Sequence, residues 1–238
     1  MFETNNSWET IVKKSLSQLD DDYLSFLLED KTYFPNSDNF LNAFKTLPLE
    51  KTKYILFGQD PYPREKSAIG YAFIDGDVKN LWNEKNGLSK EVNKATSLRN
   101  FMKMLLVANG NLKENNTTKE AIAKINKEPY IDSILSLRDN FEHNGVLLLN
   151  TALIFTVKED SKKHVKQWQP FIKKLLEQIK EEDITLILFG SMAKELQKIE
   201  TVKHFKTFEC EHPYNTSFIL NKNVQKFFSL MKLLEKSC

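Results

Sequence analysis

Apolar residues along the chain follow two patterns: short continuous runs, and longer segments in which they recur every three or four positions. Runs bounded by glycine or polar residues are typical of strands that are buried on both faces of a parallel sheet. Four segments fit this description, at residues 53–57, 146–150, 184–189 and, more weakly, 204–210. We therefore predict four short parallel strands at the centre of the fold.

Helical patterns separate these runs. Residues 7–29 and 38–46 carry apolar side chains at helical spacing near the N-terminus. Three further helices are predicted. One begins after Ser97, a second has Pro170 in its first turn, and a third covers residues 224–234. Strands that alternate with helices predict an α/β fold with three layers, in which helices cover both faces of the central sheet.

The length of the chain indicates how these elements are organised. We predict a single domain over residues 1–238, because a chain of this size can bury one sizeable core. Residues 1–50 supply N-terminal helices, and 54–234 form the core. Two polar stretches, 75–94 and 109–129, show little periodicity, so we expect them to be surface insertions.

Composition narrows the class of protein. The chain has 34 Lys and Arg against 32 Asp and Glu, a formal charge of +2, which argues against nucleic-acid binding by bulk charge but leaves room for a local basic groove. We find no secretory signal, no apolar run of the roughly 18–20 residues that span a membrane, and too few cysteines for a disulfide framework. We therefore expect a cytoplasmic protein. Its four His and two Cys lack metal-ligand spacing, so we expect no metal and no cofactor.

Polar residues follow each of the predicted strands. In open α/β sheets, ligands bind beyond the carboxyl ends of the strands. Pro61 and Pro63 stiffen the first of these loops by fixing the backbone φ angle. The side chains expected at this edge of the sheet are Gln59, Asp60, Asn150, Gly190, Ser191 and His212.

The block Gly58-Gln-Asp-Pro-Tyr62 resembles the water-activating loop of the family 1 uracil-DNA glycosylases. Other family motifs follow in the same order, and the resemblance covers roughly residues 54–234. Because the motifs share their order, coincidence is a poor explanation for them. They are Gly70-Tyr-Ala-Phe73, Ser97-Leu-Arg-Asn100, Leu147-Leu-Leu-Asn-Thr151, the segment from Ser161 to Trp168 with His164, Phe189-Gly-Ser-Met-Ala193 and Glu211-His-Pro213.

The resemblance implies a monofunctional DNA repair enzyme. Such an enzyme hydrolyses the N-glycosidic bond of deoxyuridine in single- or double-stranded DNA, releases uracil and leaves an abasic site. No covalent intermediate is expected, because no lysine lies in the pocket motifs. The resemblance also implies a monomer, and it makes small acidic inhibitor proteins that mimic DNA candidate partners.

Two residues are the candidates for catalysis. Breaking the bond develops a cation on the sugar and an anion on the base. By resemblance, Asp60 stabilises the cation and orients a water molecule, and His212, used neutral, donates a hydrogen bond to O2 of the departing uracil.

Four residues are the candidates for uracil recognition. Asn150 has both a donor and an acceptor, so it can pair with O4 and N3–H of uracil, whereas cytosine has the opposite polarity at both atoms. Phe73 offers a flat face for stacking on the base, and Tyr62 fills the space that the methyl group of thymine needs. Gln59 is expected to bind the base through its backbone.

A further set is expected to contact DNA around the extruded nucleotide. Extrusion is required because the bond is hidden in the base stack. Thr216 aligns with the apolar wedge of the family, and Tyr214 is the alternative wedge. Contacts to backbone phosphates position DNA without reading its sequence. The residues at these family positions are Ser97, Gly190, Ser191 and Ser217.

The sequence also departs from the family pattern in three places. Pro63-Arg-Glu-Lys-Ser67 replaces a histidine and a glycine-rich segment, and Lys94-Ala-Thr96 replaces a proline-rich loop. Tyr214-Asn-Thr216 replaces Ser-Pro-Leu in the intercalation loop, which is also the loop that inhibitor proteins grip. The altered wedge predicts weaker activity on double-stranded DNA and a relative preference for single strands.

Other readings of the same residues remain open at this point. The chain could be a non-catalytic module that binds DNA or a partner on a glycosylase fold, or a relative that acts on another damaged base. Taken alone, Asp60 could form a turn, Asn150 could end a strand and Ser191 could cap a helix. The joint presence of five pocket residues favours the enzyme, because a scaffold has no evident use for Asp60, Tyr62, Phe73, Asn150 and His212 together.

Overall fold

The computed structural model describes residues 3–30, 32–85 and 87–236. Its backbone divides into two compact units. The first comprises residues 1–75 and 145–209, and the second comprises residues 76–144 and 210–238. Each unit is described separately below, and the single domain expected from chain length stays a prediction.

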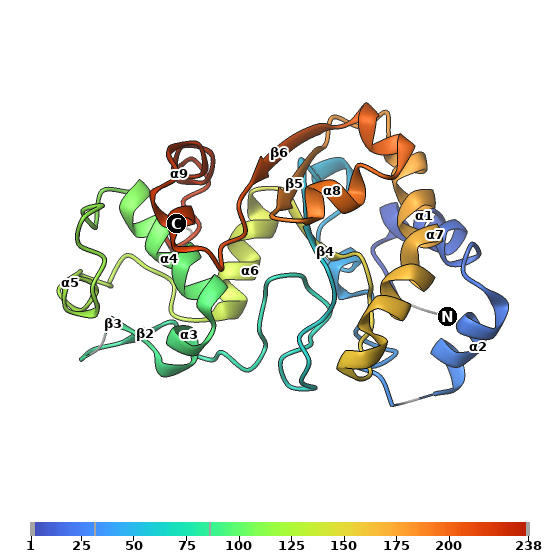
Figure 1. Ribbon diagram of the computed structural model, residues 1–238, viewed down its shortest axis with the longest axis horizontal. Helices are drawn as coiled ribbons and strands as arrows, with labels where there is room; N and C mark the ends of the chain where they lie inside the picture. Colours follow the sequence, from blue (N-terminus) through green and yellow to red (C-terminus); the bar gives the residue numbers. More distant parts are fainter. Residues whose placement is uncertain (1–2, 31, 86, 237–238) are drawn as a thin grey trace. The chain divides into compact units, whose positions relative to one another are not determined.

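The first unit is built on the central sheet (Figure 1). β1 pairs in parallel with both β4 and β5. The four-stranded parallel sheet flanked by helices confirms the predicted fold class. In the order in which the strands lie in the sheet, they are β4 (Val146–Asn150), β1 (Tyr54–Gly58), β5 (Thr185–Phe189) and β6 (Lys206–Cys210).

Burial explains why the strands differ in the strength of their pattern. All five residues of β4 are buried, which is why its sequence reads as one apolar run. β6 lies at the edge of the sheet, and Lys206, Thr207 and Glu209 on it are exposed. An edge strand needs fewer apolar residues, so its run was the weakest of the four.

The N-terminal segment forms two helices where one continuous helical pattern was read over 7–29. They are α1 (Asn6–Leu16) and α2 (Asp21–Glu29), and the Asp20 side chain caps α2 by accepting from the backbone N–H groups of Asp22 and Tyr23. The helix predicted over 38–46 is wrong. Only the 3₁₀ turn η1 (Asn42–Phe44) forms there, although Phe44 is fully buried against Trp8.

The long helix of this unit is α7 (Ser161–Ile179). The sequence placed Pro170 in the first turn of this helix, but it lies in the interior. Proline has no N–H group to donate, so it removes one hydrogen bond from the helix. The burial of the neighbouring side chains Trp168 and Phe171, both inaccessible to solvent, outweighs this loss. The helix begins at Ser161, well before Pro170, and this brings Ser161 into the site described below. The unit is completed by the short helix α8 (Met192–Leu196) and by the turns η2 (Leu49–Lys51), η3 (Lys158–Asp160) and η4 (Glu200–His204).

The second unit is mainly helical. Its core centres on Phe101, whose ring lies 5.8 Å from that of Phe141, 6.0 Å from Phe218 and 5.0 Å from Phe228. A two-stranded antiparallel ribbon is formed by β2 (Trp82–Asn83) and β3 (Gly87–Leu88). The helices are α3 (Lys90–Lys94), α4 (Thr96–Ala108), α5 (Lys119–Ala123), α6 (Ile134–His143) and α9 (Lys222–Ser229), with the turn η5 (Thr216–Leu220).

The segments expected as surface insertions, 75–94 and 109–129, contribute to the core of the second unit. Leu81, Val92 and Ile122 are each no more than 1 % exposed. Val92 and Ile122 lie on helices of five residues each, and Leu81 directly precedes the two-residue strand β2, so these elements are too short to show a periodicity in sequence. The expectation of surface excursions is therefore wrong for these residues.

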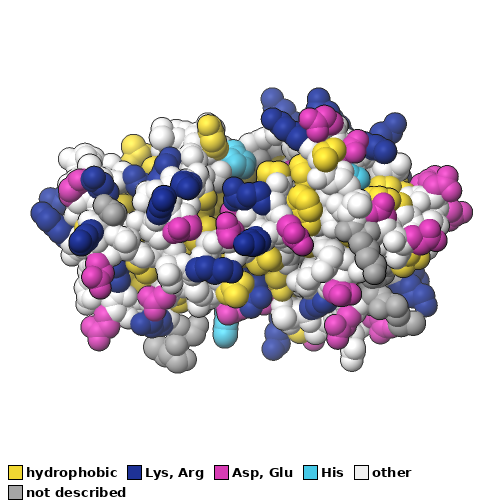
Figure 2. Space-filling model, turned by 90° about the horizontal axis from the view of Figure 1, so that it is seen from below, with side chains coloured by type: hydrophobic (Ala, Val, Ile, Leu, Met, Phe, Trp, Pro, Cys, Tyr) yellow, Lys and Arg dark blue, Asp and Glu magenta, His cyan; other side chains and the backbone are white. Residues whose placement is uncertain are grey.

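No helix in the described part of the chain is long and apolar enough to cross a membrane. The face of the molecule drawn in Figure 2 carries Lys and Arg side chains interspersed with Asp and Glu, without a uniformly basic area. This mixture agrees with the near balance of charges in the sequence.

Candidate active site

The site in the first unit begins where β1 and β4 end side by side. Gly58 is the register partner of Asn150. A Cβ atom placed on Gly58 would lie 2.2 Å from Oδ1 of Asn150, a distance that side chains do not adopt. Glycine at this position therefore makes room for the Asn150 amide at the end of the sheet.

The side-chain amide of Asn150 lies at the end of β4 and can both donate and accept a hydrogen bond. It is 6 % exposed, and its amide forms no hydrogen bond to any residue that the structure describes. The amide atoms are not among the fully enclosed polar atoms of the described chain that lack a partner, so they can be reached from outside the protein. With a donor and an acceptor group, they can bind a molecule that offers the complementary pair.

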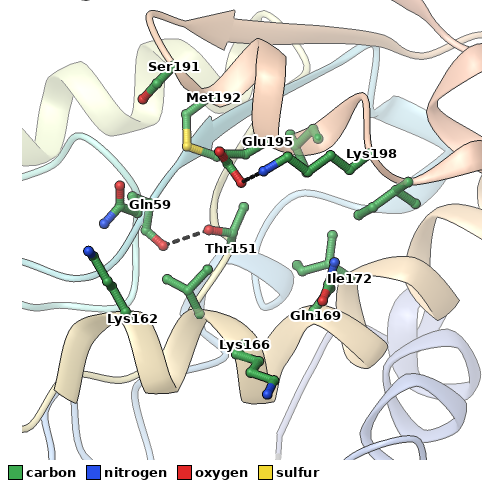
Figure 3. A pocket seen from close by; sticks show the side chains of 13 residues that line it. Gln59, Thr151, Lys162, Lys166, Gln169, Ile172, Ser191, Met192, Glu195 and Lys198 are labelled. Carbon is green, nitrogen blue, oxygen red and sulfur yellow. Dashed lines mark hydrogen bonds and ion pairs between the residues drawn. The ribbon is translucent and has the colours of Figure 1, made fainter.

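Backbone hydrogen bonds tie the loop after β1 to the residues after β4. The carbonyl of Gln59 accepts from the Thr151 hydroxyl at 2.8 Å and from the Ala152 N–H at 2.9 Å, and the carbonyl of Gly58 accepts from the Thr151 N–H at 2.9 Å. Figure 3 shows the bond between Gln59 and Thr151. The position of Asp60, the next residue along, is thereby fixed relative to Asn150.

Asp60 receives a hydrogen bond that the sequence analysis did not assign. Oδ2 of its carboxylate accepts from the hydroxyl of Ser161, the first residue of α7. The segment from Ser161 to Trp168 had been singled out for its histidine, but His164 is buried and its ring nitrogens are engaged by other partners, 2.7 Å from the Tyr23 hydroxyl and 2.9 Å from the Thr156 hydroxyl. The serine at the start of that motif is thus the residue that reaches the carboxylate.

The two aromatic candidates lie together in the same unit. The Tyr62 hydroxyl donates to the backbone carbonyl of Phe73 at 3.1 Å. Burial raises the pKa of the Tyr62 phenol well above its ordinary value, which keeps this donor protonated. The Phe73 ring packs edge to face on Phe189, at 6.4 Å between ring centroids, so both aromatics have fixed positions.

A cavity of about 600 Å³ adjoins this edge of the first unit (Figure 3). Gln59 and Ser191 are the predicted site residues that line it. Gly190, with φ at +59°, adopts a left-handed conformation that lets the chain turn from β5 into α8. The other lining residues come from α7, from α8 and from the ends of nearby elements: Thr151, Lys162, Val165, Lys166, Gln169, Ile172, Met192, Glu195, Leu196, Lys198 and Ile199.

His212 is held by its own loop in the second unit. The backbone N–H of Tyr214 donates to Nδ1 of His212 at 3.1 Å, so the proton of the neutral ring is assigned to Nε2. The ring remains accessible, yet the protein around it removes enough water to lower the pKa of His212 below its ordinary value. The side chain is therefore a neutral donor through Nε2 at pH 7.

Helix α4 anchors the same loop through Asn100. This side chain is 1 % exposed, and its Nδ2 donates to the carbonyls of Pro213 at 2.8 Å and Tyr214 at 3.2 Å. Asn100, the last residue of the Ser-Leu-Arg-Asn motif, thus fixes the loop of His212, a role that was not predicted from the sequence. Ser97 lies in the first turn of α4, which begins at Thr96 without a side-chain cap. Tyr214, Thr216 and Ser217 are exposed.

The predicted site residues therefore form two sets, each gathered within one unit. No group of three or more His, Cys, Asp or Glu side chains in the described ranges could hold a metal ion. The first set comprises Gln59, Asp60, Tyr62, Phe73, Asn150, Gly190 and Ser191, and the second comprises Ser97, His212, Tyr214, Thr216 and Ser217.

Comparison with known proteins identifies the family to which this arrangement belongs. The sequence model of the uracil DNA glycosylase superfamily matches residues 44–232. The chain belongs to the uracil DNA glycosylase superfamily. This confirms the family resemblance that the motifs indicated.

Individual relatives agree with the family assignment. The chain is 48% identical to the wild-type UNG of Nitratifractor salsuginis, whose crystal structure it matches with a TM-score of 0.96 over 98% of this chain and 94% of that one. It is 28% identical to the uracil-DNA glycosylase of Clostridioides difficile, over 99% of this chain and 96% of the relative. A mimivirus uracil-DNA glycosylase, 18% identical with a TM-score of 0.58, shares the fold.

The contacts of Asn100 predict a local effect on the loop around His212. Replacing Asn100 with Ala removes both hydrogen bonds to the loop carbonyls and should destabilise the protein by about 1–3 kcal/mol. Hydrogen–deuterium exchange should increase at residues 211–217. The matched control is Asn93→Ala, because Asn93 also donates to two carbonyls, at 3.1 Å and 2.9 Å, but on α3. Equal exchange at 211–217 in both variants would contradict the anchoring role.

Proposed function

We propose that Asp60 and His212 act on the two halves of the N-glycosidic bond that this enzyme hydrolyses. The chain is a DNA repair glycosylase that releases uracil from DNA and leaves an abasic site. The observation that supports our assignment of the uracil site most strongly is the placement of the Asn150 amide at the end of β4, where Gly58 on β1 leaves room for it.

Asp60 serves the sugar side of the reaction. As the bond breaks, positive charge develops on the sugar, and a carboxylate beneath the ring stabilises it. The hydroxyl of Ser161 binds Oδ2 of Asp60, so Oδ1 is left to orient the attacking water. Ser161 is then a positioning residue, because it fixes the carboxylate without touching the sugar.

His212 serves the base side. The departing uracil carries negative charge on O2, and Nε2–H of a neutral imidazole can donate to it. The hydrogen bond from the Tyr214 N–H to Nδ1 and the lowered pKa of His212 both support this protonation state. A neutral donor needs no proton transfer to the base before the bond breaks.

Asn150, Phe73 and Tyr62 recognise the base. Nδ2 of Asn150 donates to O4 of uracil, and Oδ1 accepts from N3–H. Cytosine would present an acceptor to the acceptor and a donor to the donor, which leaves buried groups unpaired. Phe73 stacks on the ring, Tyr62 occupies the space of a methyl group at C5, and Gln59 binds the base through its backbone.

The remaining predicted residues contact DNA around the extruded nucleotide. Ser97, Ser191 and Ser217 place hydroxyls against phosphates, and Gly190 brings its backbone close to the same strand. Tyr214, which is 67 % exposed, is our preferred wedge over the smaller Thr216, because an aromatic ring fills more of the space that the nucleotide leaves.

We further propose that the enzyme acts as a monomer and that small acidic inhibitor proteins bind it. A mimivirus UNG variant has been solved in complex with UGI. In this chain, such a partner would contact the loop that carries Tyr214 and Thr216.

The catalytic roles predict large and specific losses of activity. Asp60→Asn and His212→Leu should each lower uracil release about 10²–10⁴-fold, because each removes charge stabilisation from the transition state. Release is measured on a uracil-containing oligonucleotide at pH 7.5. Asp183→Asn and His204→Leu, exposed residues outside the site, serve as controls. Equal activity in all variants would exclude the assignment.

The packing of Gly58 against Asn150 predicts a second effect. Gly58→Ala should displace the Asn150 amide and weaken binding of free uracil about tenfold or more, because a pair of hydrogen bonds to the base is lost. Calorimetric titration measures this. The double variant Gly58→Ala/Asn150→Ala should bind no more weakly than Asn150→Ala alone. Additive losses would mean that Gly58 acts by another route.

The exposed wedge predicts a dependence on DNA strandedness. We expect faster release from single-stranded than from double-stranded substrate, because the altered loop plugs a duplex poorly. Tyr214→Ala should lower the rate on the duplex by about tenfold and leave the single-strand rate nearly unchanged, since stacking contributes about 1–3 kcal/mol. Equal losses on both substrates would rule out a wedge role for Tyr214.

A further inference from the structure

The segment Pro63 to Ser67, which departs from the family pattern, contains an ion pair next to the two aromatic residues of the site. Nη2 of Arg64 lies 2.9 Å from Oδ2 of Asp75, and Nε of Arg64 donates to the Ser67 hydroxyl at 3.0 Å. The side chain of Asp75 is only 4% exposed, whereas that of Arg64 is 61% exposed. A buried carboxylate needs a partner, and the arginine reaches in from the surface to supply it.

The ion pair joins the two loops that carry Tyr62 and Phe73. Arg64 follows Tyr62 by two residues, and Asp75 follows Phe73 by two residues. The same loops are joined twice more, by the hydrogen bond from the Tyr62 hydroxyl to the Phe73 carbonyl and by an antiparallel bridge between Ala68 and Asp75. These three links hold the Tyr62 ring and the backbone of Phe73 in place relative to each other.

The backbone of Phe73 shows why such links are needed. Its φ angle is +69°, in the left-handed region that a bulky side chain seldom adopts. A residue persists in this conformation only where its surroundings over-determine it. On one side the Ala72 N–H donates to the Leu148 carbonyl of β4 at 3.1 Å, and on the other side Asp75 is held by Arg64.

The charges of the pair also reach the Tyr62 hydroxyl. Burial is the main cause of the raised pKa of Tyr62, the carboxylate of Asp75 raises it further, and the guanidinium of Arg64 opposes the rise. The three groups therefore form one electrostatic unit. Losing either charge changes the electrostatic environment of the Tyr62 hydroxyl, which donates to the Phe73 carbonyl.

We propose that Arg64 and Asp75 are positioning residues for base selection. Their ion pair holds Tyr62 and Phe73 at the spacing that admits uracil and excludes a methyl group at C5. This role rests on the proposed function of Tyr62 and Phe73. It also gives a use to the segment that replaces the histidine and glycine-rich stretch of the family.

The test compares Arg64→Met with Lys66→Met. Both variants lose one positive charge from the same exposed loop, but Lys66 takes no part in the ion pair. We expect Arg64→Met to lower kcat/KM for uracil about tenfold and to raise the ratio of thymine to uracil release by a similar factor, the size of one lost charged hydrogen bond. Asp75→Asn should do the same. The double variant Arg64→Met/Asp75→Asn should lose no more than the worse single variant, because the two residues act as a unit.

Hydrogen–deuterium exchange at residues 71–75 gives a readout that does not depend on activity. It should increase in Arg64→Met and stay at the wild-type level in Lys66→Met. If both variants raise only KM, with an unchanged thymine-to-uracil ratio and unchanged exchange, Arg64 is a simple DNA contact and the proposal is overturned. A wild-type protein that releases no uracil would instead overturn the proposed function and the selection role with it, while the exchange data would still report whether the ion pair fixes Phe73.

Discussion

The parallel pairing of β1 with β4 is the constraint on which the rest of the site depends. Its register sets Gly58 beside Asn150, and the absence of a side chain on Gly58 lets the Asn150 amide lie at the end of the sheet. The same pairing continues as backbone bonds from Thr151 and Ala152 to the loop that carries Asp60. The side chains that we propose to read the base and to orient water are thus placed by one strand pair.

Each unit adds its own supports to the groups it carries. In the first unit, Ser161 fixes the Asp60 carboxylate, and the pair of Arg64 and Asp75 braces the strained backbone of Phe73. In the second unit, buried Asn100 fixes the loop of His212. Each of these hydrogen bonds and ion pairs has at least one buried or partly buried partner, and together they hold the supported groups in fixed positions.

The fold class and the family could be predicted from the sequence, for identifiable reasons, whereas the roles of the site residues stay predictions. The strand at 146–150 is buried throughout, so its apolar run marks it at the right residues. Pro170 misled the prediction of α7, because a proline is usually a sign of a helix start, and burial of its neighbours carried the helix through it. The sequence did not reveal the supporting roles of Ser161, Asn100 and Arg64. Each role depends on a contact with a residue outside its own motif, and a local sequence pattern carries no information about such contacts.

The central claim is that Asn150 reads the base. The most direct measurement is nuclear magnetic resonance of the Asn150 side-chain amide during titration with free uracil and, separately, with cytosine. The account predicts a downfield shift of the Nδ2 protons with uracil, since they then donate to O4, and no such shift with cytosine. Binding of uracil that leaves the Asn150 resonances unchanged, or an equal response to cytosine, would contradict it.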